Sequence, residues 1–320
     1  MSTPTLRLVF FGTPDFAVPS LERLLAGPHE VVAVVSQPDR PRGRGRKETP
    51  SPVAAVALAH ETPLLRPERV GDPEVARALL AHEPDLGIVV AFGQFLPRRI
   101  RELPRRGYLV NAHASLLPRH RGAAPIAHAI LAGDARTGVC AMRVEREMDA
   151  GAVCGVAETA IGAEETAGEL TARLAAMAAE LIAATVDRAA RGELDAPEAW
   201  AAQDDARATL APRIEREDAR LDFAEPAAAL ARRVRAMSPK PGAFVLWQGE
   251  PLRILAARVE PGHCDDAPGT VGAAPDGGVR IATGDGWLRP TRLQRAGARA
   301  LDVADFQRGR GLADGERLGR

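Results

Sequence analysis

The chain has 320 residues, of which 42 are Lys or Arg and 42 are Asp or Glu, so its formal net charge at pH 7 is zero. That total alone predicts no polyanionic partner, but the charge is unevenly placed. Residues 1–150 hold 20 basic and 16 acidic side chains, residues 151–205 hold 3 and 11, and residues 206–320 hold 19 and 15. At roughly 150 residues per domain, the length predicts two domains. A hydrophobic content of 46% is typical of a globular chain and argues against a disordered one.

Membrane, secreted and metal-binding classes are poorly supported. No uninterrupted apolar run reaches the ~18 residues that a membrane span needs, and residues 1–12 lack the charged start and cleavage site of a signal peptide. We therefore expect a cytoplasmic protein that does not bind membranes. Three widely spaced cysteines, Cys140, Cys154 and Cys264, indicate small buried side chains, so neither a disulfide framework nor a metal site is expected.

The first half of the chain alternates apolar runs with helical patterns. Strands are expected at residues 6–11, 31–35, 86–91, 108–110 and 139–144. Helices are expected between them at residues 16–26, 52–60 and 72–82. Continuous apolar strands separated by helices predict an α/β fold with a mostly parallel, doubly wound sheet. Ligands of such sheets bind at the carboxyl ends of the strands.

The second half of the chain has a different pattern of predicted elements. The capping box Thr-Ala-Gly-Glu at 166–169 predicts a long helix that ends near Arg191, followed by an acidic linker at 192–209. Short strand candidates at 243–247, 252–259 and 279–282 are separated by glycine turns. They predict a small β-barrel, although a sandwich would suit them as well. The expected domains are thus 1–191 and 210–310, and a frayed, charged tail is expected after Phe306, with 311–320 as its end.

Two polar residues stand at the end of the strand candidate at 108–110. Residues i and i+2 of a strand point to the same side, so Asn111 and His113 are expected to project together. Asp149 follows the next strand and is a candidate partner for His113. An amide that donates to an oxyanion, a histidine that moves protons and a carboxylate that orients it would suit acyl transfer to an amine. A buried hydrogen-bonded pair and a turn aspartate are the structural alternatives.

No nucleophile signature accompanies these residues. The chain has no Gly-x-Ser-x-Gly elbow, catalytic-cysteine signature or His-Glu-x-x-His. We therefore expect direct attack by a substrate nucleophile, without a covalent enzyme intermediate.

A basic loop follows the second strand candidate. Five cations lie within eight residues: Arg40, Arg42, Arg44, Arg46 and Lys47. The loop lacks P-loop spacing, and Gly-Thr-Pro-Asp at 12–15 is not a dinucleotide fingerprint. A solvated surface loop is one interpretation, but its place at a strand's carboxyl end favours contact with a nucleic-acid backbone. A second basic cluster consists of Arg232, Arg233, Arg235 and Lys240, and we expect both clusters to share the face onto which Asn111 and His113 open.

Several segments carry a resemblance to a known family. They include Phe-Gly-Thr-Pro-Asp-Phe at 11–16, Gln-Pro-Asp-Arg-Pro at 37–41, Ala-Phe-Gly at 91–93, Asn-Ala-His-Ala-Ser-Leu-Leu-Pro at 111–118, Arg-Gly-Ala-Ala-Pro-Ile at 121–126 and Glu-Asp-Ala-Arg-Leu-Asp-Phe at 217–223. In order and spacing, the chain resembles the methionyl-tRNA formyltransferase family. The resemblance implies a Rossmann-like formyltransferase domain followed by a β-barrel that is similar to an OB-fold.

The resemblance also implies an activity and a set of site residues. The reaction would transfer a formyl group from 10-formyltetrahydrofolate to the α-amino group of methionine on initiator tRNA, with no metal and with a monomeric enzyme. The catalytic residues would be Asn111, His113 and Asp149. The folate segment would be Ser115, Leu116, Leu117 and Pro118, with Phe92 and Gly93 beside the pterin. The loop at 42–47 would reach the acceptor end of the tRNA.

This sequence departs from the family pattern at three alanines. Ala114 replaces a glycine after the histidine, where a positive φ would strain any residue with a Cβ. Ala150 and Ala152 replace two polar residues around the aspartate, which puts the loop geometry and the turnover rate in question. Two alternatives stay open: a sibling formyltransferase that acts on a glycinamide or amino sugar nucleotide, and an RNA-binding regulator with an inactive core.

Overall fold

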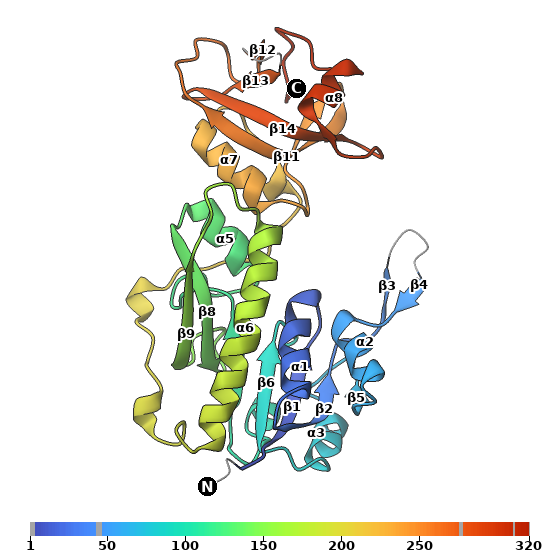
Figure 1. The fold of residues 1–320 in the computed structure, drawn as a ribbon, viewed down its shortest axis with the longest axis vertical. Coiled ribbons are helices and arrows are strands. Elements are labelled where there is room, and N and C mark those ends of the chain that lie inside the picture. Colours follow the sequence, from blue (N-terminus) through green and yellow to red (C-terminus); the bar gives the residue numbers. More distant parts are fainter. Residues whose placement is uncertain (1–3, 43–46, 275–277, 310, 320) are drawn as a thin grey trace. The chain divides into compact units, whose positions relative to one another are not determined.

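The computed structural model describes residues 4–42, 47–274, 278–309 and 311–319 (Figure 1). The chain divides into two compact units, each assembled from separate stretches of sequence. Met1–Gly122, Thr137–Thr159 and Thr171–Ala211 form the N-terminal unit, and Ala123–Arg136, Ala160–Leu170 and Pro212–Arg320 form the C-terminal unit. In the ranges that are described, no helix combines the length and apolarity needed to cross a membrane.

The N-terminal unit is built on a seven-stranded sheet in the order β5-β2-β1-β6-β7-β8-β9. Its strands are β1 (Arg7–Gly12), β2 (Glu30–Val35), β5 (Leu64–Leu65), β6 (Leu86–Val90), β7 (Leu109–His113), β8 (Arg136–Arg143) and β9 (Val153–Ala160). The pairs from β5 to β7 are parallel, and β7 pairs with β8 antiparallel. All five residues of β6 are buried, as its continuous apolar sequence predicts for a strand covered on both faces. The predicted mostly parallel sheet is confirmed.

Helices cover this sheet. They are α1 (Val18–Leu25), which follows a short 3₁₀ turn at Asp15–Ala17, α2 (Pro52–Ala59), α3 (Pro73–Leu80), α4 (Arg98–Arg101) and most of α6 (Ala167–Ala190). Local chemistry fixes their starts. Pro52 opens α2, where the Ser51 hydroxyl caps the Ala54 N–H at 3.0 Å. α6 packs along β9 where Gly155 leaves room for Leu181.

The basic loop forms a small hairpin of β3 (Arg40–Arg42) and β4 (Lys47–Thr49). Arg44 and Arg46, which come between these strands in the sequence, lie outside the described residues.

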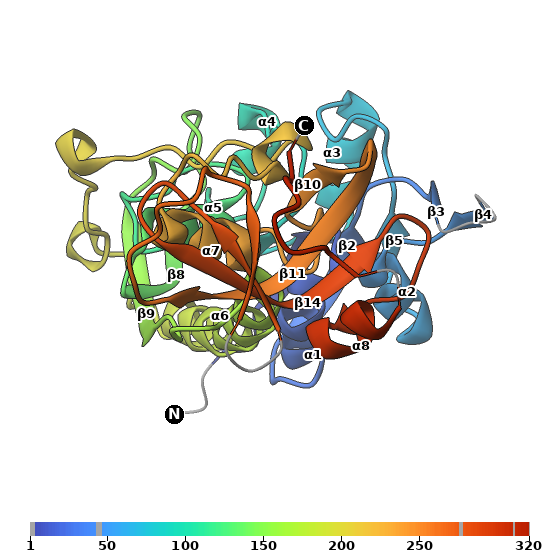
Figure 2. The same cartoon turned by 90° about the horizontal axis from the view of Figure 1, so that it is seen from above.

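The C-terminal unit combines helices with an antiparallel sheet. Its helices are α5 (Pro125–Ala132), α7 (Ala227–Ala236) and α8 (Val303–Arg308). The sheet runs β10-β11-β14-β13-β12, with β15 beside β14, and its strands are β10 (Phe244–Trp247), β11 (Glu250–Glu260), β12 (Val271–Ala273), β13 (Val279–Ala282), β14 (Trp287–Arg295) and β15 (Leu301–Asp302). The two longest strands of this sheet, β11 and β14, pair with each other and lie side by side (Figure 2).

The end of the chain closes this sheet into a ring. The Val271 N–H on β12 donates to the Glu316 carbonyl at 2.8 Å, and the Gly319 N–H donates to the Leu246 carbonyl on β10 at 2.9 Å. The segment therefore bridges the two ends of the strand order, as a barrel requires. Leu318 is only 4% exposed. The expectation of a frayed tail is wrong for these residues, because their backbone groups complete the barrel.

Candidate active site

Strand β7 carries both Asn111 and His113, which are two residues apart and therefore point to the same side of the sheet. Asn111 pairs with Val89 on one side, and His113 pairs with Cys140 on the other. The His113 side chain is 6% exposed and is contacted at both ring nitrogens. Its Nε2 lies 2.9 Å from the His120 carbonyl oxygen, and its Nδ1 lies 3.5 Å from Asp149 Oδ2. Because a carbonyl only accepts, Nε2 carries a proton and Nδ1 is left to the carboxylate.

Asp149 reaches His113 from a loop with an unusual backbone. Its φ of 52° lies in the left-handed region, which non-glycine residues adopt mostly where function or tight turns require it. Its Oδ2 accepts the Gly122 N–H at 2.9 Å, so one carboxylate oxygen faces both a backbone donor and the histidine. The expected grouping of His113 with Asp149 is present in the structure.

Gln203 holds this loop from the segment that the sequence suggests is a linker. Its Nε2 donates to the Asp149 carbonyl at 2.8 Å and to the Gly151 carbonyl at 2.7 Å. The Arg121 guanidinium donates to Gln203 Oε1 at 3.0 and 2.8 Å and so fixes the amide orientation. Sequence reasoning missed Gln203, since a lone glutamine in an acidic stretch carries no signal.

The alanine departures leave the loop intact. Ala114 is absent from the described residues with positive φ, so its Cβ meets no left-handed strain, and the expected strain there is wrong. The loop beside Ala150 and Ala152 is held by backbone carbonyls, which any residue supplies. Gly151 is required, because a Cβ there would lie 1.9 Å from the Arg143 carbonyl oxygen.

The predicted folate segment follows His113 directly. Ser115 is fully buried, and its hydroxyl donates to the Arg119 carbonyl at 2.6 Å, which ties the turn together. Leu116, Leu117 and Pro118 are partly exposed. The segment therefore offers apolar side chains on a rigid turn, while the serine hydroxyl is already used.

Phe92 and Gly93 lie at the carboxyl end of β6. The Phe92 ring is 2% exposed and packs edge to face on Phe11, with ring centroids 5.6 Å apart, so it belongs to the core. Its carbonyl accepts from Thr13 Oγ1 at 2.9 Å and from Gln37 Nε2 at 3.1 Å. A Cβ on Gly93, where φ is +84°, would lie 2.5 Å from Gln37 Nε2. The Phe92 side chain itself is not available for stacking in this conformation.

Cys140 lies opposite His113, but its environment is wrong for a nucleophile. Burial raises the pKa of its thiol to about 11, and a hydrogen bond with the Leu117 backbone offsets this only in part. A Cys–His pair that forms a covalent intermediate needs a lowered thiol pKa. The geometry therefore agrees with direct attack by a substrate amine.

Two family models cover nearly the whole chain. The formyl transferase model matches residues 6–186, and the model of the formyl transferase C-terminal domain matches residues 213–311. This chain belongs to the formyl transferase family. Relatives of this formyl transferase include the methionyl-tRNA formyltransferase of Halorhodospira halophila, 47% identical over 310 residues, which are 97% of this chain and 98% of the relative. Another is that of Roseiflexus sp. (strain RS-1), 44% identical over 316 residues, or 98% of this chain and 95% of the relative.

Solved structures share the fold of this formyl transferase. The N-formyltransferase from Helicobacter canadensis, in complex with folinic acid and dTDP-3-aminofucose, gives a TM-score of 0.64 at 15% identity and covers 91% of this chain and 100% of its own. HypX from Aquifex aeolicus, in complex with tetrahydrofolic acid, gives 0.59 at 18% identity over 97% of this chain and 49% of its own. The formyl transferase thus spans about half of HypX. Identities this low establish the architecture and nothing finer.

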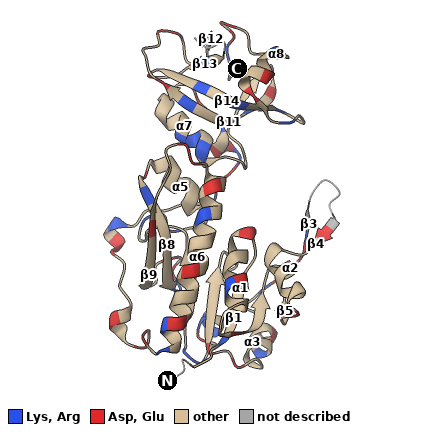
Figure 3. Ribbon diagram, viewed as in Figure 1, with Lys and Arg blue, Asp and Glu red and all other residues tan. Residues whose placement is uncertain are grey.

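The basic residues of this formyl transferase fall into separate environments. Arg40 is exposed and forms an ion pair with Glu68 at 3.2 Å. Arg232, Arg233 and Arg235 all come from α7, which carries a run of basic residues (Figure 3). Lys240 is exposed in the turn after this helix. That the two clusters share one face with Asn111 stays a prediction.

Across the part of the chain that the structure describes, no group of three His, Cys, Asp or Glu side chains could hold a metal ion.

Proposed function

We propose that this formyl transferase moves a formyl group from 10-formyltetrahydrofolate to the α-amino group of methionine on initiator tRNA. The observation that carries the proposal is identity of 42–47% with methionyl-tRNA formyltransferases over nearly the full length of both chains. The match includes the C-terminal domain, at residues 213–311. By contrast, the sugar N-formyltransferase from Helicobacter canadensis shares only 15% identity, so the sibling alternative rests on fold alone.

In this reaction Asn111 and His113 would stabilise the formyl oxygen. The amine nitrogen attacks the formyl carbon, the carbonyl electrons move onto oxygen, and the amide and imidazole N–H groups stabilise that charge by donating hydrogen bonds to it. The Asn111 amide makes no side-chain hydrogen bond with the residues that the structure describes, which leaves its donors free for the substrate. The His113 Nε2–H would exchange the His120 carbonyl for the formyl oxygen.

Asp149 would complete the proton transfer. The attacking amine must lose a proton, and folate N10 must gain one as its bond to the formyl carbon breaks. Asp149 stabilises positive charge on His113 through the contact between Oδ2 and Nδ1, so the pair can accept the first proton and return it. No bond to the enzyme forms at any stage.

The remaining assignments are part of the same proposal. The partly exposed side chains of Leu116, Leu117 and Pro118 would border the folate, with the backbone at Phe92 and Gly93 as a second wall. The tRNA phosphates would be contacted by the cations of the basic loop, Arg40, Arg42, Arg44, Arg46 and Lys47, and by the second basic cluster, Arg232, Arg233, Arg235 and Lys240. A monomeric state and a cytoplasmic location rest on the family resemblance.

A panel of amine acceptors tests the proposal. Purified protein with 10-formyltetrahydrofolate is given methionyl initiator tRNA, free methionine or an amino sugar nucleotide in parallel. Formyl transfer should be fastest, by orders of magnitude in kcat/KM, to the charged tRNA. Preference for the amino sugar nucleotide would establish the sibling activity, and loss of transfer to all three would leave an RNA-binding protein with an inactive core.

A further inference from the structure

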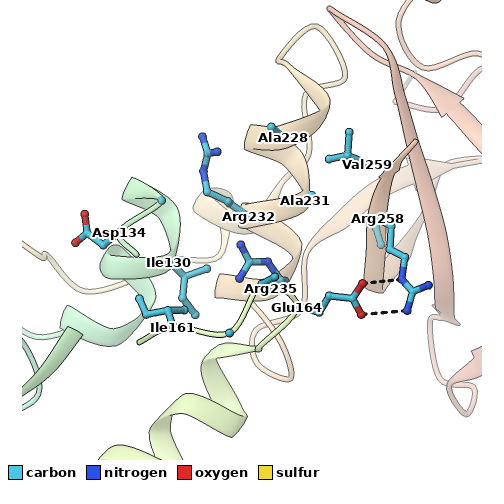
Figure 4. Close-up of a pocket in the computed structure, with 14 residues that line it drawn as sticks. Ile130, Asp134, Ile161, Glu164, Ala228, Ala231, Arg232, Arg235, Arg258 and Val259 are labelled. Atoms are coloured by element: carbon cyan, nitrogen blue, oxygen red, sulfur yellow. Dashed lines mark hydrogen bonds and ion pairs between the residues drawn. The ribbon is translucent and has the colours of Figure 1, made fainter. Parts of the chain in front are cut away.

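The C-terminal unit contains a cavity that is lined by two arginines of α7 and by none of the residues Asn111, His113 and Asp149. Its volume is about 530 Å³, which is within the range of small-molecule sites. The end of α5, residues 161–164, α7 and β11 form its walls (Figure 4). All of these segments belong to the C-terminal unit.

One face of α7 supplies the cationic wall. Ala228, Ala231, Arg232 and Arg235 follow the i, i+3, i+4, i+7 spacing of a single helix face, and all four line the cavity. The two small alanines leave space between the helix and β11. Arg232 and Arg235 project toward the side of Ile130 and Asp134 (Figure 4).

The positive charges of Arg232 and Arg235 are not neutralised by an ion pair with a carboxylate of the described residues. Arg232 Nε donates to the Leu131 carbonyl at 3.2 Å, and one Arg235 Nη donates to the Glu165 carbonyl at 3.2 Å. Neither guanidinium forms an ion pair with another described residue. Burial lowers the pKa of Arg235, and repulsion from Arg232 lowers it further, against opposing contributions from Glu164 and Glu165.

The other charged groups of the cavity are differently placed. Arg258 forms a two-pronged ion pair with Glu164, at 2.9 Å from Nε to Oε1 and 3.0 Å from Nη2 to Oε2, which neutralises both. Asp134 also lines the cavity and has interactions of its own. The apolar side chains of Ile130, Ile161 and Val259 make up the rest of the wall.

We propose that this cavity binds the phosphate group of a nucleotide, with Arg232 and Arg235 holding its oxygens. Guanidinium groups bind phosphate in planar, two-pronged geometry, and each of these arginines retains N–H groups beyond the one it donates to a carbonyl. A dianion between them removes the repulsion that the pair otherwise bears. The apolar wall suits the ribose or base, and the volume suits one nucleotide.

The nucleotide could be one unit of an RNA chain or a free nucleotide, since both present the same phosphate. The RNA source rests on the proposed tRNA substrate, whereas the cavity's affinity for phosphate does not. A purely structural role is the competing explanation, because both arginines also tie α7 to neighbouring carbonyls. The experiment has to distinguish phosphate binding from this structural role, and RNA from a free nucleotide.

The first measurement uses adenosine monophosphate and inorganic pyrophosphate as probes with the full chain. Calorimetric titration of the wild type should show binding, and the Arg232→Gln/Arg235→Gln variant should bind at least tenfold more weakly. Arg253→Gln/Arg292→Gln is the matched control, because it removes two exposed arginines of the same unit that do not line the cavity. The control should bind as the wild type does. No binding to the wild type, or equal loss in both variants, overturns the proposal.

The second measurement identifies the source of the phosphate. The logarithm of the Kd for methionyl-tRNA is followed against the logarithm of salt concentration. If RNA is the ligand, the cavity variant should lose about one unit of slope for the lost phosphate, more than the control variant does. An unchanged slope with lost probe binding supports a free nucleotide. Because the probe titration needs no formyl transfer, it stays decisive even if the acceptor panel shows no activity.

Discussion

The placement of His113 can be predicted from the local sequence alone. Its projection beside Asn111 follows from strand alternation, and that expectation needs no tertiary information. The approach of Asp149 is different, because it depends on a left-handed φ of 52° and on two hydrogen bonds from Gln203, 54 residues away along the chain. Such long-range backbone contacts leave no local pattern in the sequence.

The cysteines give a test at the residue scale. Burial raises the thiol pKa of both Cys140 and Cys154 to about 11, so little thiolate forms at pH 8. Cys264 is partly exposed. With an aromatic disulfide reagent, the native protein should release about one thiolate equivalent quickly, and denatured protein should release three. Rapid reaction of all three in the native state would mean that the sheet around Cys140 is not closed.

At the scale of elements, local signals succeeded where they were strong. The capping box at 166–169 predicts the start of α6, and both reciprocal bonds are present: Glu169 Oε2 accepts the Thr166 N–H at 2.9 Å, and Thr166 Oγ1 accepts the Glu169 N–H at 3.3 Å. Strand β9 was missed, because its small residues Gly155 and Ala157 blur the period-two pattern. Helix α7 was seen only as a charge cluster, since its buried face consists largely of alanines.

Removing the cap measures its contribution. Thr166→Ala should lower the free energy of unfolding at neutral pH by about 1 kcal/mol in urea titrations, while Thr166→Ser should change it little. The cap's hydrogen bonds from Thr166 lower the pKa of Glu169, so its stabilisation is present above the ordinary glutamate pKa and is lost as the pH falls through the folded value. The difference between wild type and Thr166→Ala should therefore shrink in acid. A difference that does not change with pH would contradict the reciprocal cap.

On the scale of the whole molecule, the two compact units are not continuous stretches of the chain. Contiguous domains at 1–191 and 210–310 are the natural expectation from composition and rhythm, and they stay a prediction. The contacts instead place residues 123–136 and 160–170 with the C-terminal unit. Composition cannot reveal this, because helix α5 and the start of α6 look like any other part of the first half. The role of the closing segment at the chain end was missed for a related reason: its glycines and charges predict a tail.

The barrel closure predicts a large effect from a residue close to the chain end. Leu318→Ala removes a side chain that is 4% exposed and should lower stability by about 2–4 kcal/mol, seen as a lower Tm in calorimetry. Leu210→Ala is the matched control, because Leu210 is 78% exposed and its truncation should cost less than about 0.5 kcal/mol. Equal effects of the two variants would show that the end of the chain does not pack on the barrel.

We propose that this chain formylates methionyl initiator tRNA with His113 and Asn111 at the reacting carbon. The most direct measurement is the rate of formylmethionyl-tRNA formation by the wild type and by His113→Ala at saturating 10-formyltetrahydrofolate. The wild type should form the product, and the variant should be slower in kcat by about 10²–10⁴-fold with its melting temperature nearly unchanged. A His113→Ala enzyme that works at the wild-type rate would contradict the account.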